Sequence, residues 1–223
     1  MVDSICSELE LRREFINDEV QTIYFGGGTP SVLDQNQLNQ ILAKIEELFP
    51  IAADTEITLE ANPDDLTTDY LRQLNEAGVN RLSIGIQSFR DEDLEMMNRS
   101  HNYSQAIDCV KEAKSMGIDN ITIDLIYGIP GLSNDAWVGN INQALNLGVN
   151  HISAYSLTIE PRTVFSNWKD KGKLVVTSDD KYHEQFVILR KMLLEAGFDH
   201  YEISNFAKPG HFSRHNSAYW KGK

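Results

Sequence analysis

Four short segments of similar pattern recur along the chain, and they constrain its fold more than any other feature. Each has a glycine followed by an apolar residue and an Asn or Asp: AGVN (77–80), MGID (116–119), LGVN (147–150) and AGFD (196–199). Glycine in the left-handed conformation commonly ends a helix. Because a β-branched run follows each segment at once, the repeat predicts helix, glycine stop and strand in succession, which is the unit of parallel α/β sheets and barrels.

The runs and stripes around this repeat predict the individual elements. Candidate strands, most of them nearly continuous in apolar residues as parallel strands are, cover residues 21–25, 56–61, 81–87, 120–127, 151–157 and 200–205. Amphipathic stripes predict helices within 38–49, 107–116, 137–145 and 182–193, and a helix is also expected over 7–15. Ser104, Ser133 and Ser178 stand where N-caps would be. We predict one α/β domain over residues 1–223.

Charge and hydropathy exclude several classes of protein. The 223 residues carry 33 Asp and Glu against 20 Lys and Arg, a formal net charge of −13. Nucleic-acid-binding proteins carry basic faces, so this charge argues against a nucleic-acid partner. No apolar stretch approaches the roughly 18 residues of a membrane span, and no basic segment followed by an apolar run begins the chain. We therefore expect a cytoplasmic protein.

Polar residues gather where the predicted strands end. The glycines of 26–29 (GGGT) follow the first strand and allow a ligand close to the backbone, although a tight turn would also need them. Glu60 and Gln87 end the next two strands, Asp124 interrupts an apolar strand, and Arg99 lies about one helix after Gln87. Each alone has a structural explanation, such as a local cap or an Asp124–Arg99 ion pair. Because parallel strands end at one rim, together they predict a polar pocket.

Metal-binding and nucleophilic motifs are sparse. Cys6 and Cys109 are the two cysteines of the sequence, too few for a disulfide framework or an all-cysteine zinc site. Cys109 lies in an amphipathic stretch and is expected to be a packing residue. His211 and His215 are four residues apart, as in a helical metal pair, but KPGHFSRHN is too rich in Pro and Gly to predict a helix. No GxSxG elbow occurs, which argues against a serine hydrolase.

Five motifs, taken together and in this order, resemble a known family. They are YFGGGTPSVL (24–33), EITLEANPDDL (56–66), VNRLSIGIQSF (79–89), ITIDLIYGIPG (121–131) and LTIEPRTVF (157–165). They resemble the radical S-adenosylmethionine (SAM) enzymes related to oxygen-independent coproporphyrinogen III oxidase, over nearly the whole chain. TIEPRTVF and HNSAYW (215–220) resemble in particular the HemW-type heme chaperone branch. The family fold would be a partial TIM-type (β/α)6 barrel, with residues from about 200 to 223 beginning the segment after it.

The resemblance also implies cofactor sites. The backbone of Gly27, Gly28 and Thr29 would hold the amino end of SAM, and Glu60 and Arg99 would contact its methionine portion. Gln87 and Asp124 would bind the ribose hydroxyls, and Thr158 would lie beside the adenosyl group. The HNxxY(W) motif of the chaperone branch is implicated in heme binding, which here implies His215, Asn216 and Tyr219. The alternative for that motif is a polar turn that packs an aromatic pair.

The sequence departs from the family at the iron–sulfur cluster. The CxxxCxxC motif that holds the [4Fe–4S] cluster belongs upstream of the predicted helix 7–15, and the 223 residues do not contain it. Cys6 alone cannot replace three thiolates at defined spacing. We expect the first strand and the C-terminal domain to be missing. We also expect this polypeptide neither to assemble the cluster nor to cleave SAM to the 5′-deoxyadenosyl radical.

Several functions remain open for the whole protein. The first is a heme chaperone that delivers heme to membrane-bound acceptor proteins, and the second is a true coproporphyrinogen III oxidase that forms protoporphyrinogen. A radical SAM enzyme acting on RNA is a third class, which the charge of −13 opposes. A non-enzymatic scaffold is the fourth, and it predicts that Gln87→Ala and Asp124→Ala leave the affinity for SAM unchanged.

Overall fold

The computed structural model describes residues 1–222 and divides the chain into two compact units. The first unit comprises residues 1–84, residues 109–121 and the chain from Ser213 onward. The second comprises residues 85–108 and 122–212. Among the described helices, none is both long and apolar enough to cross a bilayer. The prediction of a single domain over the whole chain stays a prediction.

The first unit is built on parallel strands. They are β1 (Val20–Phe25), β2 (Ile51–Ala61) and β3 (Arg81–Gln87), paired in that order, with β3 continuing into the second unit. The register places Tyr24 opposite Thr58 and Glu60 opposite Ser83. Every residue of β3 is buried, as expected for a strand covered on both faces.

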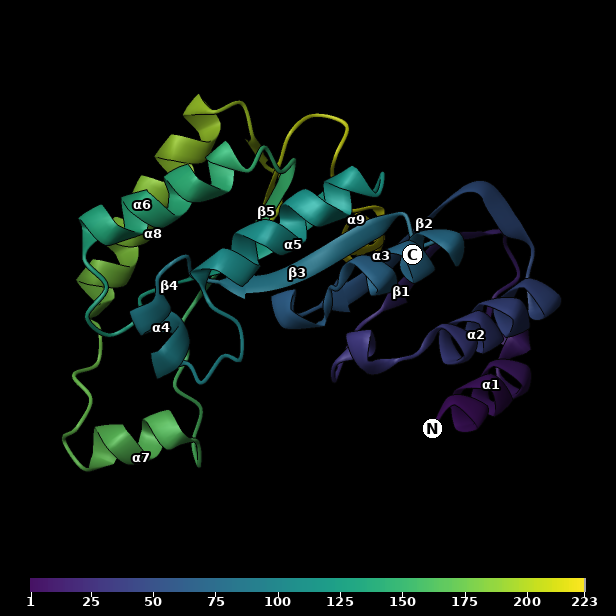
Figure 1. Ribbon diagram of the computed structural model, residues 1–223, viewed down its shortest axis with the longest axis horizontal. Helices are drawn as coiled ribbons and strands as arrows, with labels where there is room; N and C mark the ends of the chain where they lie inside the picture. Colours follow the sequence, from purple (N-terminus) through teal and green to yellow (C-terminus); the bar gives the residue numbers. More distant parts are fainter. Residues whose placement is uncertain (223) are drawn as a thin grey trace. The chain divides into compact units, whose positions relative to one another are not determined.

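Helices and short 3-10 turns complete the first unit (Figure 1). The helices are α1 (Val2–Leu11), α2 (Gln35–Leu48), α3 (Thr68–Glu76) and α9 (Arg214–Trp220), and the 3-10 turns are Arg13–Phe15, Pro30–Val32 and Pro63–Asp65. Helix α1 packs on α2. Asp34 caps α2 by accepting a hydrogen bond from the Gln37 N–H at 2.9 Å, while Gln37 accepts one from Asp34 N at 3.1 Å. This reciprocal cap fixes where α2 begins, directly after the glycine loop and its turn.

The second unit combines parallel and antiparallel strands. Strands β4 (Asn120–Tyr127) and β5 (His151–Ser156) are parallel, whereas β7 (Asn205–Ala207) pairs antiparallel with β5 and β6 (Asp199–His200). Its helices are α4 (Asp91–Met96), α5 (Tyr103–Ser115), α6 (Asn134–Asn146), α7 (Val164–Asp170) and α8 (Asp179–Glu195). Helix α5 runs into the first unit after Asp108. Extended connections lead into and out of α7 (Figure 1).

The predicted repeat of glycine helix stops is confirmed. Gly78, Gly117, Gly148 and Gly197 all have φ between +64° and +86°, and a strand follows each of them. The strands predicted up to residue 157 are also confirmed, with β2 beginning earlier, at Ile51. The α/β class therefore follows from a pattern that is local in the sequence.

The strand predicted over residues 200–205 is wrong. Strand β6 ends at His200 and β7 begins at Asn205, and the two are antiparallel with Asp199 opposite Ala207. The residues between them form the turn of this hairpin, where His200 Nε2 lies 3.1 Å from the carbonyl oxygen of Ile203. The alternating pattern of HYEISN is that of a strand, but the reversal of the chain interrupts it.

Two helix starts also differ from the prediction. Helix α1 begins at Val2 rather than at residue 7, and a separate 3-10 turn covers Arg13–Phe15. Ser104 is not the cap of α5, because that helix begins at Tyr103 and Asn102 exchanges hydrogen bonds of 3.0 Å with Gln105. The predicted caps of α6 and α8 are confirmed at Ser133 and Ser178.

Candidate functional site

The glycine loop, residues 26–29, follows β1 in the first unit and is exposed. Gly27 has φ of +106°, and a Cβ added at Gly27 or Gly28 would have nothing within 4 Å. A Cβ at Gly26 would instead lie 2.7 Å from a ring carbon of Tyr24 and 3.1 Å from Oε1 of Glu60. Gly26 thus lets these two side chains lie against the loop, while the backbone of Gly27 and Gly28 stays open to a ligand.

Glu60 is held beside this loop by a single strong contact. It is half-buried in β2, and its Oε1 accepts a hydrogen bond from the hydroxyl of Tyr24 at 2.7 Å. Because an ionised carboxylate offers about four acceptor positions, Glu60 retains capacity for a cationic or hydroxyl ligand. The structure therefore brings the predicted residues Gly27, Gly28 and Glu60 together, whereas their role in SAM binding stays a prediction.

The predicted heme motif forms helix α9 rather than a polar turn. Ser213 caps α9 by accepting a hydrogen bond from the N–H of Asn216 at 3.2 Å. His215 lies in the first turn of α9 and Tyr219 four residues later, so the two side chains share one face of the helix. His211 precedes the helix, so His211 and His215 do not share one, as the Pro and Gly of this segment indicate.

His215 is packed against β1. Its ring stacks on Tyr24 with centroids 4.6 Å apart and planes inclined by 22°, and its Nδ1 lies 3.3 Å from Oγ1 of Thr22. Burial lowers the pKa of His215, and the charge of Glu56 opposes that shift. The neutral imidazole favoured by burial is the form that binds a metal ion. Its Nε2 makes no hydrogen bond with any residue in the part of the chain that is described.

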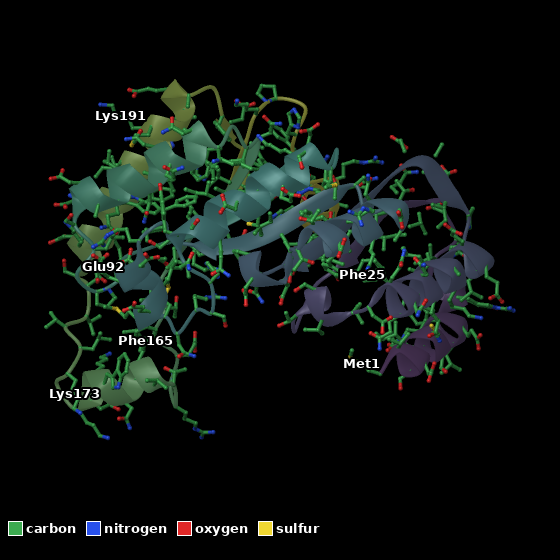
Figure 2. The ribbon with its side chains drawn as sticks, viewed as in Figure 1. Met1, Phe25, Glu92, Phe165, Lys173 and Lys191 are labelled. Carbon is green, nitrogen blue, oxygen red and sulfur yellow. The ribbon has the colours of Figure 1, made fainter. Side chains whose placement is uncertain are left out.

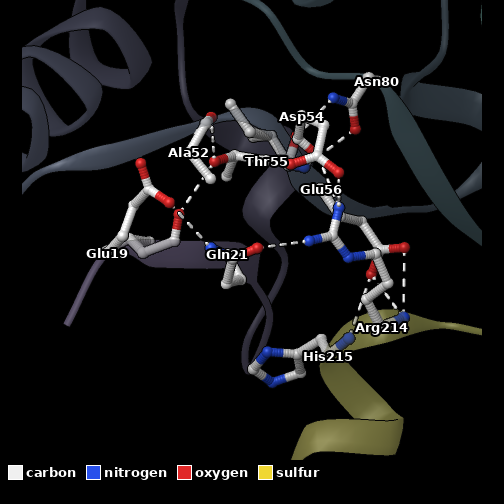
Figure 3. Close-up of polar contacts among 11 residues, drawn as sticks. Glu19, Gln21, Ala52, Asp54, Thr55, Glu56, Asn80, Arg214 and His215 are labelled. Atoms are coloured by element: carbon white, nitrogen blue, oxygen red, sulfur yellow. Dashed lines mark hydrogen bonds and ion pairs between the residues drawn. The ribbon is translucent and has the colours of Figure 1, made fainter.

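A buried carboxylate anchors the start of α9 (Figure 3). Glu56, 6% exposed, accepts the backbone N–H of Arg214 at 3.0 Å and that of His215 at 3.2 Å. Its Oε2 also lies 3.6 Å from Nε of the buried Arg81. A negative charge at the first turn stabilises a helix because the unpaired N–H groups point at it. Glu56 therefore fixes the backbone of His215.

The side chain of Arg214 also ties the start of α9 to β1 and β2 (Figure 3). Its Nη1 donates to the carbonyl of Asp54 at 2.6 Å, and its Nη2 donates to the side-chain oxygen of Gln21 at 2.8 Å. Glu56 and Arg214 are absent from the predicted site residues. The available signal was a charged residue, Glu56, at the start of the apolar run EITLEA, but its partners on α9 lie about 158 residues away in sequence.

An apolar cavity of about 490 Å³ adjoins the glycine loop within the first unit. Side chains of α1, β1 and α2 line it, together with Met1, which precedes α1. Met1 and Phe25 are labelled in Figure 2. Gly26 and Gly28 also border it. The loop thus has an apolar surface on one side and the Tyr24–Glu60 pair on another.

In the second unit, Gln87 occupies a strained turn. Its φ is +68°, and the N–H of Ser88 donates to the carbonyl of Ile86 at 2.8 Å, which closes a γ-turn around it. Its side chain is buried. Strain of this kind costs about 1–3 kcal/mol and persists only where the surroundings enforce it. The predicted role of Gln87 as a ligand at the end of β3 stays a prediction.

Buried hydrogen bonds enforce that turn. Ser88 Oγ donates to Asp93 Oδ2 at 2.7 Å and accepts from Asn140 Nδ2 at 3.0 Å. Nε2 of the buried His101 lies 3.0 Å from the carbonyl oxygen of Ile86. Burial raises the pKa of Asp93, while the bond from Ser88 and the charge of Arg90 lower it. These contacts join the end of β3 to α4 and α6 and set the position of Gln87.

Asp124 and Arg99 also belong to the second unit. Asp124 is half-buried within β4, opposite Ser153 of β5. Arg99 is half-buried just after α4, and its N–H donates to the carbonyl of Leu94 at 2.9 Å. Their predicted ion pair, and their predicted contacts with SAM, stay predictions.

Thr158 borders a cavity of the second unit, about 580 Å³ in volume, which we call the Thr158 pocket. Aromatic rings form much of its wall, and the side chains of Lys169, Asp179 and His183 also line it. The rings are those of Tyr127, Tyr182 and Phe186. Burial raises the pKa of both Tyr127 and Tyr182, so both hydroxyls stay neutral. Cavities of this size with aromatic walls commonly hold small organic ligands.

Close packing at Gly128 shapes this pocket. Gly128 has φ of +74°, and a Cβ added there would lie 1.8 Å from a ring carbon of Tyr182. The hydroxyl of Tyr182 donates to the carbonyl of Leu157 at 2.8 Å, and the N–H of Gly128 donates to the side chain of Gln185 at 2.7 Å. Glycine is therefore required at position 128, because the ring of Tyr182 occupies the space that a side chain at this position would need.

The described residues do not supply an iron–sulfur site. Cys6 and Cys109 are both buried, and Cys6 packs into an apolar cluster with Val2, Ile41 and Ile45. Within residues 1–222, no group of three or more His, Cys, Asp or Glu side chains is placed to hold a metal ion. A [4Fe–4S] cluster needs three thiolates, so these residues do not fit it.

Comparison with protein families gives the class to which the chain belongs. Residues 7–144 match the model of the radical SAM superfamily, and the chain belongs to that superfamily. Among individual proteins, it is 39% identical to the heme chaperone HemW of Bacillus subtilis and 38% identical to that of Lactococcus lactis. The match to the Bacillus protein covers 100% of this chain and 60% of that protein. The match to the Lactococcus protein covers 98% of this chain and 57% of that protein.

A solved structure supports the same assignment. The chain superposes on coproporphyrinogen III oxidase (HemN) from Escherichia coli with a TM-score of 0.82 and 25% identity. The match covers 99% of this chain and 50% of the oxidase. The predicted radical SAM fold related to this oxidase is therefore confirmed, as is the similarity to the HemW-type branch.

Proposed function

We propose that the protein is a cytoplasmic heme chaperone of the radical SAM superfamily, which binds heme through α9 and SAM through the glycine loop and the strand ends. It would pass heme to acceptor proteins at the membrane. Sequence identity of 38–39% to proteins named heme chaperone HemW supports this function. The chain spans 57–60% of those relatives, and the proposal concerns the intact protein.

The observation that carries the proposal is the setting of His215. Its backbone is held by Glu56 and its Nδ1 by Thr22, while Nε2 has no hydrogen-bond partner within residues 1–222. The neutral ring suits coordination to heme iron. Tyr219, 75% exposed on the same helix face, and Asn216 would contact the edge of the macrocycle.

For SAM, we propose one contact for each predicted residue. The backbone at Gly27 and Gly28, which is open to a ligand, and the carboxylate of Glu60 would hold its ammonium group, with Thr29 beside them. Arg99 suits its carboxylate. Gln87 and Asp124 would bind the ribose hydroxyls, and the adenosyl group would enter the cavity of about 580 Å³ that Thr158 borders. In this superfamily, SAM beside a [4Fe–4S] cluster supplies a 5′-deoxyadenosyl radical.

The alternative, a true coproporphyrinogen III oxidase, has weaker support. The oxidase from Escherichia coli is 25% identical to this chain, whereas the two heme chaperones are 38% and 39% identical. We therefore do not adopt the oxidase function, and an assay for protoporphyrinogen in the same preparation distinguishes the two.

The test is a titration of the intact protein with hemin, followed at the Soret band. We expect saturable binding with one heme per chain, and His215→Ala should weaken it at least about tenfold, the equivalent of roughly 1.4 kcal/mol. His211→Ala is the matched control, since His211 lies outside α9, and it should bind as the wild type does. Equal heme affinity in all three proteins would contradict the assignment of His215.

A further inference from the structure

We propose that Tyr24 is a positioning residue that couples the SAM and heme sites, so that SAM bound at Glu60 tightens the binding of heme at His215. This inference rests on the function proposed above. It concerns contacts within the first unit alone, and it assigns to Tyr24 a role beyond that of holding Glu60 in place.

The contacts of Tyr24 join the two sites directly. Its hydroxyl donates to Glu60 at 2.7 Å, and its ring stacks on the imidazole of His215 at 4.6 Å. One rigid aromatic side chain thus touches both the carboxylate proposed to hold the ammonium of SAM and the histidine proposed to hold iron. A phenol ring transmits a displacement because its ring and hydroxyl move together.

The surroundings limit how this side chain can respond. Gly26 lies so close that even a Cβ would meet the Tyr24 ring at 2.7 Å, which leaves little room on the loop side. On the other side, the backbone of His215 is held by Glu56 and its Nδ1 lies near Thr22. A change in the position of Glu60 is therefore passed to the His215 ring rather than absorbed by empty space.

The sign of the coupling follows from the acceptor capacity of Glu60. An ionised carboxylate can accept from the ammonium of SAM and from the Tyr24 hydroxyl at the same time. A bound ammonium fixes Glu60, which fixes Tyr24 and the ring stacked on it. Heme then binds a His215 that is already ordered, and less conformational entropy is lost on binding. The coupling is reciprocal, so heme tightens SAM by the same factor.

The experiment measures the dissociation constant for hemin in the intact protein, with and without saturating SAM, under anaerobic conditions without reductant. In the wild type, SAM should lower that constant by about fivefold or more, the lower end of typical couplings between sites. In Tyr24→Phe the stacking ring remains but the bond to Glu60 is lost. Hemin alone should then bind almost as in the wild type, and SAM alone should bind more weakly because Glu60 loses the contact that holds it. At a SAM concentration that saturates the variant, the effect of SAM on hemin disappears.

Tyr70→Phe is the matched control, because it removes another tyrosine hydroxyl of the first unit, one that donates to the carbonyl of Leu33 at 3.1 Å. It should keep the full coupling. A wild-type coupling that survives in Tyr24→Phe would overturn the proposal, as would the absence of any coupling when both ligands bind. Failure of the proposed function is distinct, since the wild type would then not bind hemin even without SAM.

Discussion

The cluster around Glu60 and His215 in the first unit and the Thr158 pocket in the second unit are held in place by different interactions. In the first, each side chain is positioned by hydrogen bonds and a buried charge, with Glu56 and Tyr24 at the centre. In the second, the wall is made by aromatic packing, with Tyr182 filling the space beside Gly128. The first arrangement sets directions for polar ligands, and the second sets a shape.

The difference suggests a division of tasks. Charge-assisted hydrogen bonds are short and directional, and they suit groups that must meet an ammonium or a metal ion at a defined angle. Aromatic walls bury ligand surface with few directional demands. The two regions should therefore respond to different substitutions.

The largest effect is expected for Glu56→Ala. Removal of the carboxylate breaks its ion pair with the buried Arg81 and removes the acceptor of two N–H groups of α9. Loss of one partner from a buried pair costs about 3–5 kcal/mol, which urea unfolding would measure. In Glu47→Ala, which removes an exposed partner of Lys44, the cost should stay below about 1 kcal/mol. Equal costs in the two variants would refute the anchoring role of Glu56.

In the second unit, the substitution expected to lower the free energy of unfolding is Gly128→Ala. The added methyl group meets the Tyr182 ring, and the residue must keep a φ of +74°, which together should cost about 2–4 kcal/mol. The control is Gly139→Ala in the exposed face of α6, where nothing lies within 4 Å of the added carbon. That variant should gain about 0.5–1 kcal/mol from helix propensity. Thermal unfolding compares the pair, and a harmless Gly128→Ala would show that the ring is not fixed there.

The smallest effect concerns the stability of the first unit at high pH, which depends on Tyr70. Burial, with the charges of Asp65 and Asp34, raises the pKa of Tyr70 from 10.0 to about 12. Because the folded pKa is the higher one, the stabilisation is complete below pH 10.0, and it is lost as the pH rises through about 12. The difference in tyrosinate absorbance between wild type and Tyr70→Phe should show a step near pH 12. A step at pH 10.0 would mean that Tyr70 is solvated.

The elements of the fold could be predicted because their signals are local. A glycine stop and the apolar run after it lie within a few residues of one another, as at Gly78 and β3. The helix α9 could not be predicted in the same way. Its sequence neighbourhood contains Pro209 and Gly210, and the helix begins because Ser213 and the distant Glu56 receive its first N–H groups.

The candidate site shows the same division. Glu60, Gln87 and Asp124 could be singled out because each is a polar residue at or within an apolar strand. The partners that position them could not, because Tyr24 acts on Glu60 across a strand pair and Asn140 reaches Ser88 beside Gln87 from another helix. Such contacts depend on which elements meet, and no short motif encodes them.

The central claim is that His215 of the intact protein binds heme iron, and free imidazole tests it most directly. Replacement of His215 by glycine removes the ring and leaves its place against Tyr24 open. We predict that His215→Gly loses the wild-type Soret spectrum of the hemin complex, and that added imidazole restores it. A His215→Gly protein that keeps the wild-type spectrum without imidazole would contradict the account.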